Sequence, residues 1–288
     1  TKRIDFVVTL KTPPTTVVKS NVIYNLDGVN VAITSDHYPL YCDFKKPTGL
    51  EEYPKAEGDL RIGNYFLTYC KGTDGVIDYD RTGRIIAKMN ADIVCLQGLD
   101  KETERSEGID QLNVLAQKAN MHDYFAKAID YKGGEFGVGI LTKEEPVSVD
   151  RYQMAGKSEM RAAMVVEYEK FVVASTNFDT DMAKRIEALQ TLETKLSAYN
   201  KPAFLLGYFN EGDLESEFFQ MVKSNWNLLS ADKSTEVSGK KRRLDFIVSL
   251  KSHNVNVTQA DVIESLSGVD VTVASTHYPL FCDFSGLK

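Results

Sequence analysis

Hydrophobic positions along most of the chain follow two spacings, one typical of buried strands and the other of amphipathic helices. Between residues 181 and 199, Ile186, Leu189 and Leu192 recur at helical spacing. The run ADIVCLQ at 91–97 is continuously apolar, as in a strand that is covered on both faces. Strands are predicted at 61–70, 91–97, 123–129, 136–142, 162–169, 171–178, 201–207, 243–250, 269–276 and 277–284, and helices within 74–90, 108–120, 181–199 and 216–223.

Several of these strands follow one another directly, while others are separated by helices. That order predicts a mixed sheet or a pair of sheets with helices outside.

One stretch occurs twice. Residues 35–44 read SDHYPLYCDF and residues 275–284 read STHYPLFCDF. The match extends backwards without a gap: residues 2–44 align with 242–284 at an offset of 240, with 21 of 43 positions identical. Such similarity indicates an internal duplication.

The spacing of 240 residues is the size of a whole domain rather than of a short solenoid repeat. We therefore predict that residues 1–44 are the C-terminal fragment of a preceding repeat. Residues 45–58, charged and rich in Pro and Gly, are expected to be a linker, and 59–288 a complete domain.

Composition and charge limit the classes of function that the chain is expected to have. The 288 residues are 43% hydrophobic and 26% charged, with a net charge of −7, which does not draw the chain towards nucleic acid or anionic membranes from a distance. The basic cluster KKRR at 240–243 is interpreted as a solvated turn before a strand. No apolar run approaches the roughly 20 residues that a membrane span needs.

The cysteines Cys42, Cys70, Cys95 and Cys282 form no CxxC motif and no cluster with histidine, so they do not indicate a zinc site. We interpret all four as small core residues.

Five motifs in order carry a resemblance to a known family: ADIVCLQ, then GGEFGVGILT at 133–142, GYFN at 207–210, RLDF at 243–246 and STHYPL at 275–280. Residues 59–288 resemble the endonuclease/exonuclease/phosphatase superfamily almost end to end. The resemblance implies its DNase I-like, α+β fold, a four-layer α/β/β/α sandwich with the site at one edge of two central sheets.

The resemblance also implies which positions would carry the chemistry. Members cleave phosphate esters with a divalent cation, held by carboxylates, and with a histidine oriented by an aspartate. Three residues match the family pattern, namely Asn210, Asp245 and His277. Five positions depart from it, namely Cys70, Gly98, Asn177, Tyr208 and Thr276. In the N-terminal copy, Asp5, Asp36 and His37 match the pattern in full.

The departures bear on the metal. Mg²⁺ prefers carboxylate and water oxygens, and Gly98, Tyr208 and Thr276 stand where the family has carboxylates. We therefore expect no bound metal and no other cofactor. Asp245 and His277 are expected either to form a structural hydrogen bond between the last strands or to bind a phosphate or another anion.

Two functions follow. In the first, residues 59–288 form a catalytically degenerate domain that serves as a binding or scaffolding module next to an active upstream domain of the same parent protein. In the second, they form a metal-dependent phosphodiesterase or phosphatase with an altered site, using Mg²⁺ or Mn²⁺. The residues Cys70, Asn177, Tyr208, Asp245 and His277 would alternatively bind a softer metal or support metal-free chemistry. Self-association through residues 1–44 is a further possibility, since unpaired apolar strands associate readily.

Overall fold

The structure, a computed structural model, describes residue 7 and residues 16–24, 37–45 and 53–288. The chain divides into two compact units, Thr1–Pro54 and Lys55–Lys288.

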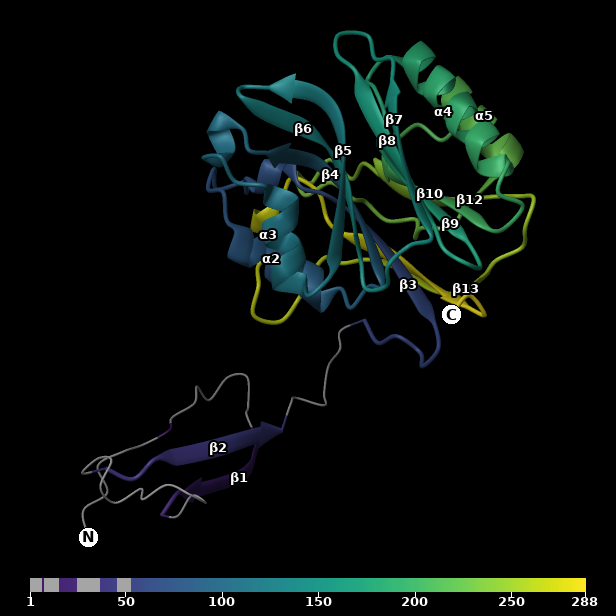
Figure 1. Ribbon diagram of the computed structural model, residues 1–288. Coiled ribbons are helices and arrows are strands. Elements are labelled where there is room, and N and C mark those ends of the chain that lie inside the picture. Colours follow the sequence, from purple (N-terminus) through teal and green to yellow (C-terminus); the bar gives the residue numbers. More distant parts are fainter. Residues whose placement is uncertain (1–6, 8–15, 25–36, 46–52) are drawn as a thin grey trace. The chain divides into compact units, whose positions relative to one another are not determined.

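Two six-stranded mixed sheets form the centre of the larger unit (Figure 1). The first has the order β11-β12-β10-β9-β8-β7, with bounds Trp226–Leu228, Asp245–Leu250, Ala203–Tyr208, Val172–Asn177, Arg161–Glu167 and Ser148–Met154. The second has the order β13-β14-β3-β4-β6-β5, with bounds Asn256–Val262, Leu280–Ser285, Leu60–Phe66, Ile93–Lys101, Gly134–Thr142 and His122–Tyr131. Parallel pairs occur at β3–β4 and β9–β10, and the other pairs are antiparallel.

Helices cover the outer face of each sheet (Figure 1). Helices α4 (Met182–Ser197) and α5 (Glu217–Asn225) pack on the first sheet, and α2 (Tyr79–Lys88) and α3 (Gln111–Ala119) on the second. Apolar side chains from both sheets, such as Ile62, Cys95 and Phe204, form one buried cluster between them. The larger unit is therefore the α+β sandwich, in four layers, that the sequence predicted.

Each of these four helices begins where a side chain accepts a hydrogen bond from the first turn. Asp78, Asp110, Asp181 and Ser216 are the capping residues. Such caps satisfy backbone N–H groups that have no partner inside the helix.

Two expectations about local structure were wrong. Residues 269–276 were predicted as a strand, but α6 (Val271–Ala274) is a short helix, because Asp270 caps its first turn and overrides the strand preference of valine and threonine. The strand predicted over 61–70 ends at Phe66, and η1 (Thr68–Cys70) follows as a tight turn whose three residues all have positive φ.

The smaller unit contains an antiparallel hairpin of β1 (Thr16–Val22) and β2 (Leu40–Lys45). Asp5 and Asp36 lie outside the described residues, whereas His37 is described and exposed. In the part of the chain that the structure describes, no helix has the length and apolar character needed to cross a membrane.

Candidate functional site

Several strands of the larger unit end at one edge. Asn177 is the last residue of β9, Tyr208 the last of β10, and Asp245 the first of β12. Tyr208 is paired in register with both Asn177 and Asp245, so the three are adjacent across the first sheet. The segment that precedes β14 brings His277 from the second sheet to the same place.

Asp245 and His277 form the centre of this edge. Nδ1 of His277 donates a hydrogen bond to Oδ2 of Asp245 over 2.6 Å, and the two residues are 5% and 0% exposed, respectively. Burial by itself lowers the pKa of His277, but the Asp245 carboxylate more than offsets this, and the net pKa is raised. The other oxygen of Asp245, Oδ1, is buried without a hydrogen-bond partner among the described residues.

Two aromatic rings pack around His277. The ring centroids of Phe66, Tyr208 and His277 are each 4.7 Å from the other two. Burial, followed by the charge of Asp245, raises the pKa of Tyr208, so its hydroxyl stays protonated at neutral pH. Tyr208 can therefore donate a hydrogen bond but cannot supply the carboxylate that the resemblance implies at this position.

Glu236 and Arg242 complete the surroundings, and sequence reasoning missed both. The backbone of Glu236 forms an isolated antiparallel β-bridge with that of His277. The Glu236 carboxylate accepts two hydrogen bonds of 2.6 Å from Arg242. Those bonds lower the pKa of Glu236 to about 2. The basic cluster is thus more than a solvated turn: Arg242 pairs beside the site, and Arg243 is largely buried with its guanidinium on Ser230. An acidic residue six positions before an arginine was the available signal.

The other family positions lie around this centre. Gly98 lies within β4 at a register irregularity and has φ +72°, and a Cβ there would come within 3.2 Å of the Phe66 ring. Thr276 is exposed, with its hydroxyl 3.1 Å from that of Thr68.

Asn210 and Asn177 are brought together more loosely. The Asn210 amide donates to Phe178 O over 2.7 Å and to Asn177 Oδ1 over 3.4 Å. Cys70 is fully buried, and its thiol faces Thr82 of α2 rather than the Asp245–His277 pair.

The donor atoms at this edge do not fit a hard divalent cation. Gly98 supplies no side chain, Tyr208 a neutral hydroxyl and Thr276 a hydroxyl, so Asp245 is the sole carboxylate among the family-matched positions of the larger unit. Within the described residues, no group of three or more His, Cys, Asp or Glu side chains is arranged to hold a metal ion. Mg²⁺ and Mn²⁺ require several such oxygens in one place.

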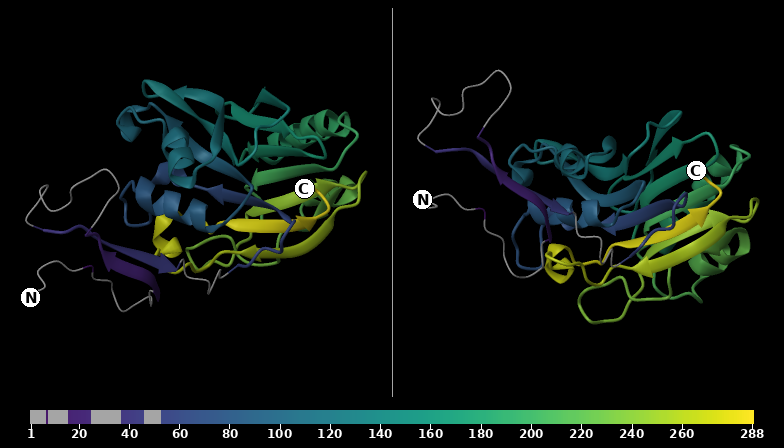
Figure 2. Two further views of the ribbon diagram at one scale, coloured as in Figure 1. Left: turned by 60° about the horizontal axis from the view of Figure 1, so that its bottom comes forward. Right: turned by 90° about the horizontal axis from the view of Figure 1, so that it is seen from below.

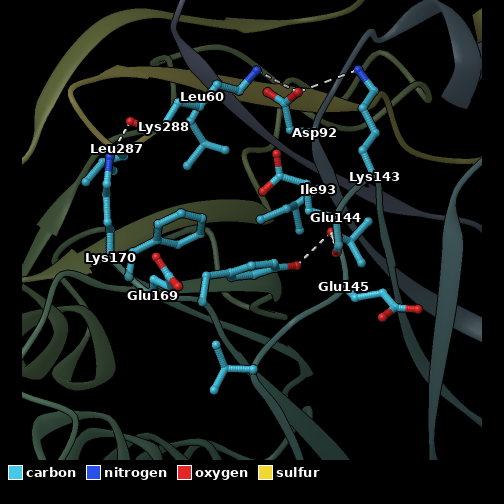
Figure 3. A pocket seen from close by; sticks show the side chains of 14 residues that line it. Leu60, Asp92, Ile93, Lys143, Glu144, Glu145, Glu169, Lys170, Leu287 and Lys288 are labelled. Atoms are coloured by element: carbon cyan, nitrogen blue, oxygen red, sulfur yellow. Dashed lines mark hydrogen bonds and ion pairs between the residues drawn. The ribbon is translucent and has the colours of Figure 1, made fainter.

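A hollow of about 610 Å³ lies elsewhere (Figure 3). It is lined by Leu60 and Ile93, the first residues of β3 and β4, whereas the Asp245–His277 pair lies beyond the last residue of β3. Across its rim, Asp92 pairs with Lys143 and Lys288 (Figure 3). None of the predicted site residues lines it, so chemistry rather than cavity size identifies the candidate site.

Comparison with known proteins supports the fold. No protein-family model matches the sequence, and no curated protein matches it. Among solved structures, an endonuclease/exonuclease/phosphatase from Beutenbergia cavernae has a TM-score of 0.69 at 19% identity, covering 80% of this chain and 73% of that one. A mannosyl-6-phosphatase of Bacteroides thetaiotaomicron has a TM-score of 0.61 at 16% identity, covering 78% and 99%. The catalytic domain of human Nocturnin, with bound sulfate, has a TM-score of 0.60 at 19% identity, covering 81% and 96%.

These likenesses establish that the larger unit has the DNase I-like fold of endonuclease/exonuclease/phosphatase proteins. At such low identity they show the fold alone, because one fold serves many activities.

Proposed function

We propose that the larger unit is a catalytically degenerate phosphoesterase-like domain that binds a phosphate-type anion without hydrolysing it. The observation that carries this proposal is the set of residues at the site: a buried Asp245–His277 pair persists, while Gly98, Tyr208 and Thr276 replace carboxylates. Metal-assisted hydrolysis needs the ion to neutralise phosphate charge and to activate water. Because Gly98, Tyr208 and Thr276 supply no carboxylate, neither role is filled.

Three donors support anion binding. Asp245 accepts a hydrogen bond from Nδ1 of His277 and favours protonation of the ring, and in the protonated ring Nε2 is a second donor. Tyr208 contributes a protonated hydroxyl beside it. Arg242 pairs with Glu236 and is near enough to affect the pKa of His277, and about half of its side chain is exposed. A histidinium, a hydroxyl and a guanidinium are suited to a phosphate because charge-assisted hydrogen bonds are strong. A sulfate is bound to the structurally similar Nocturnin catalytic domain, so the fold is compatible with such an anion.

In a longer protein, such a unit would act as a binding or scaffolding module next to an active domain of the same chain. A binding module requires no turnover, so the lost carboxylates would carry no cost for that role.

The direct test is a calorimetric titration of the full chain with inorganic phosphate and with phenyl phosphate. We expect saturable binding that His277→Gln weakens about tenfold or more, because a hydrogen bond to a charged group contributes about 1.5–3 kcal/mol. His122→Gln, at an exposed histidine that opens β5, is the matched control and should bind as the parent does. Equal affinity in the His277→Gln variant would contradict the proposal.

A further inference from the structure

The hairpin of the smaller unit has the same pairing register as the last hairpin of the larger unit. In β1–β2, Val17 pairs with Phe44 and Val22 with Leu40, and in β13–β14 the residues 240 positions later form the same pairs. Both hairpins have a register irregularity at the same place, after Val17 and after Val257. Register is set by the pattern of side chains, so an identical register indicates that both segments are built for the same surroundings.

The surroundings of the two hairpins differ. β14 pairs on its second edge with β3, and Leu280, Phe281 and Cys282 are 0% exposed there. Figure 2 shows β3 in blue beside the C-terminal strands in yellow. In the described residues, β2 pairs with β1 alone, and its residues 40–42 are partly exposed. The outer edge of β2 thus presents apolar side chains and backbone groups that its counterpart buries.

The residues of β3 that contact β14 show which kind of strand pairs with this edge. Arg61 is 0% exposed and forms two hydrogen bonds, of 2.6 and 2.7 Å, with Asp283. Its guanidinium also lies 3.9 Å from the Phe281 ring centroid. Gly63 pairs with Phe281, where a Cβ would come within 2.6 Å of Met89.

The sequence of β2 keeps the residues that β14 uses. Residues 40–44 read LYCDF against LFCDF at 280–284, so Asp43 occupies the position of Asp283 and an aromatic residue that of Phe281. A buried ion pair favours one register and one partner strand, because a charge that is buried without its counter-charge destabilises the pairing. An aspartate at this position is therefore expected to select a strand with an arginine opposite it.

We propose that the outer edge of β2 docks an antiparallel strand of the β3 type, with an arginine opposite Asp43, from another domain of the same fold. The hairpin is then the closing hairpin of that domain, and one chain carries both the hairpin and the larger unit. This inference does not depend on anion binding at His277.

The experiment titrates a fluorescent peptide of residues 59–68, with a two-lysine tail, against the full chain. Anisotropy gives the affinity, and hydrogen exchange locates the contact. We expect saturable binding and slower exchange at 40–44, with exchange at 280–284 unchanged. A peptide with glutamate in place of Arg61 should bind about tenfold more weakly or worse, and the chain variant Asp43→Arg should reverse that preference.

Three results would overturn the inference. The first is absence of saturable binding up to millimolar peptide. The second is protection at 280–284 instead of 40–44, since the peptide would then displace β14. The third is a dimer of the chain that persists unchanged in excess peptide, because a second copy would then occupy the edge. Unchanged circular dichroism of Asp43→Arg separates lost docking from lost folding.

Discussion

Burial and three nearby charged groups together determine the pKa of His277. Asp245 and Glu236 favour the imidazolium, whereas burial and Arg242 oppose it, and the net pKa is raised. A protonated His277 can both satisfy Asp245 and attract an anion.

Anion affinity should therefore depend on pH. We expect phosphate to bind well at pH 6 and to lose affinity as the pH rises through the raised pKa of His277, which lies above its ordinary value of about 6.5. Calorimetry from pH 6 to 9 measures this, and sulfate, whose charge is constant over that range, controls for phosphate ionisation. Sulfate affinity that does not vary with pH would contradict the account.

The contribution of His277 to the free energy of unfolding should also fall as the pH rises. Because the folded-state pKa of His277 is raised, its contribution is fully present below the unfolded pKa and is lost as the pH rises through the folded pKa. Urea unfolding of the wild type and of Asp245→Asn, from pH 5.5 to 9, should give a stability difference that shrinks with rising pH. A difference that grows with pH would argue against the pair.

Acidic side chains should not be equally easy to introduce at positions 98 and 276. Gly98→Glu requires φ +72° from a non-glycine residue and forces the Phe66 ring aside, so we expect a loss of roughly 1–3 kcal/mol in the free energy of unfolding. Thr276→Asp, at an exposed position, should stay within about 0.5 kcal/mol. Chemical unfolding measures the free energy of unfolding of both variants, and equal effects would show that the fold does not require glycine at position 98.

Sequence reasoning placed Asp245 beside His277, and the two are in contact. It did not identify Phe66 or Glu236, because Phe66 ends β3, far from His277 in the sequence, and Glu236 lies in a loop. Phe66 has no local signature, and the spacing of Glu236 and Arg242 does not by itself place either residue at His277, so those contacts depend on how the sheets pack.

At the scale of elements, a buried ion pair between Arg61 and Asp283 joins β3 to β14. Asp283→Asn leaves the fully buried Arg61 guanidinium without its counter-charge, so we expect a loss of about 3–5 kcal/mol in unfolding free energy. Glu187→Gln, which removes the exposed pair with Lys184, is the matched control and should cost less than about 1 kcal/mol. Urea denaturation compares them, and similar losses would mean that Arg61 finds other partners.

Strand and helix types were predictable where periodicity was long, as in α4. The segment 269–276 was not, because alternating valine and threonine favour a strand while a single capping aspartate starts a helix. β7, β11 and β13 were not predicted either, since short or half-exposed strands carry a weak pattern.

At the scale of the whole molecule, the order of motifs along the chain predicted the sandwich. Order along the chain does not determine order within a sheet: β14, the last strand, pairs with β3, the first strand of the larger unit. It also does not show how the space around His277 is filled.

The absence of metal-dependent catalysis is best tested by hydrolysis of a generic phosphodiester and a phosphomonoester, with Mg²⁺, with Mn²⁺ and with EDTA. Wild type, Asp245→Ala and His277→Ala are prepared identically, so the variants report contaminating activity. We expect no metal-dependent turnover of the wild type above the two variants. Turnover that EDTA abolishes and that both substitutions remove would contradict this expectation, and would show that this edge holds a metal through ligands other than the family's.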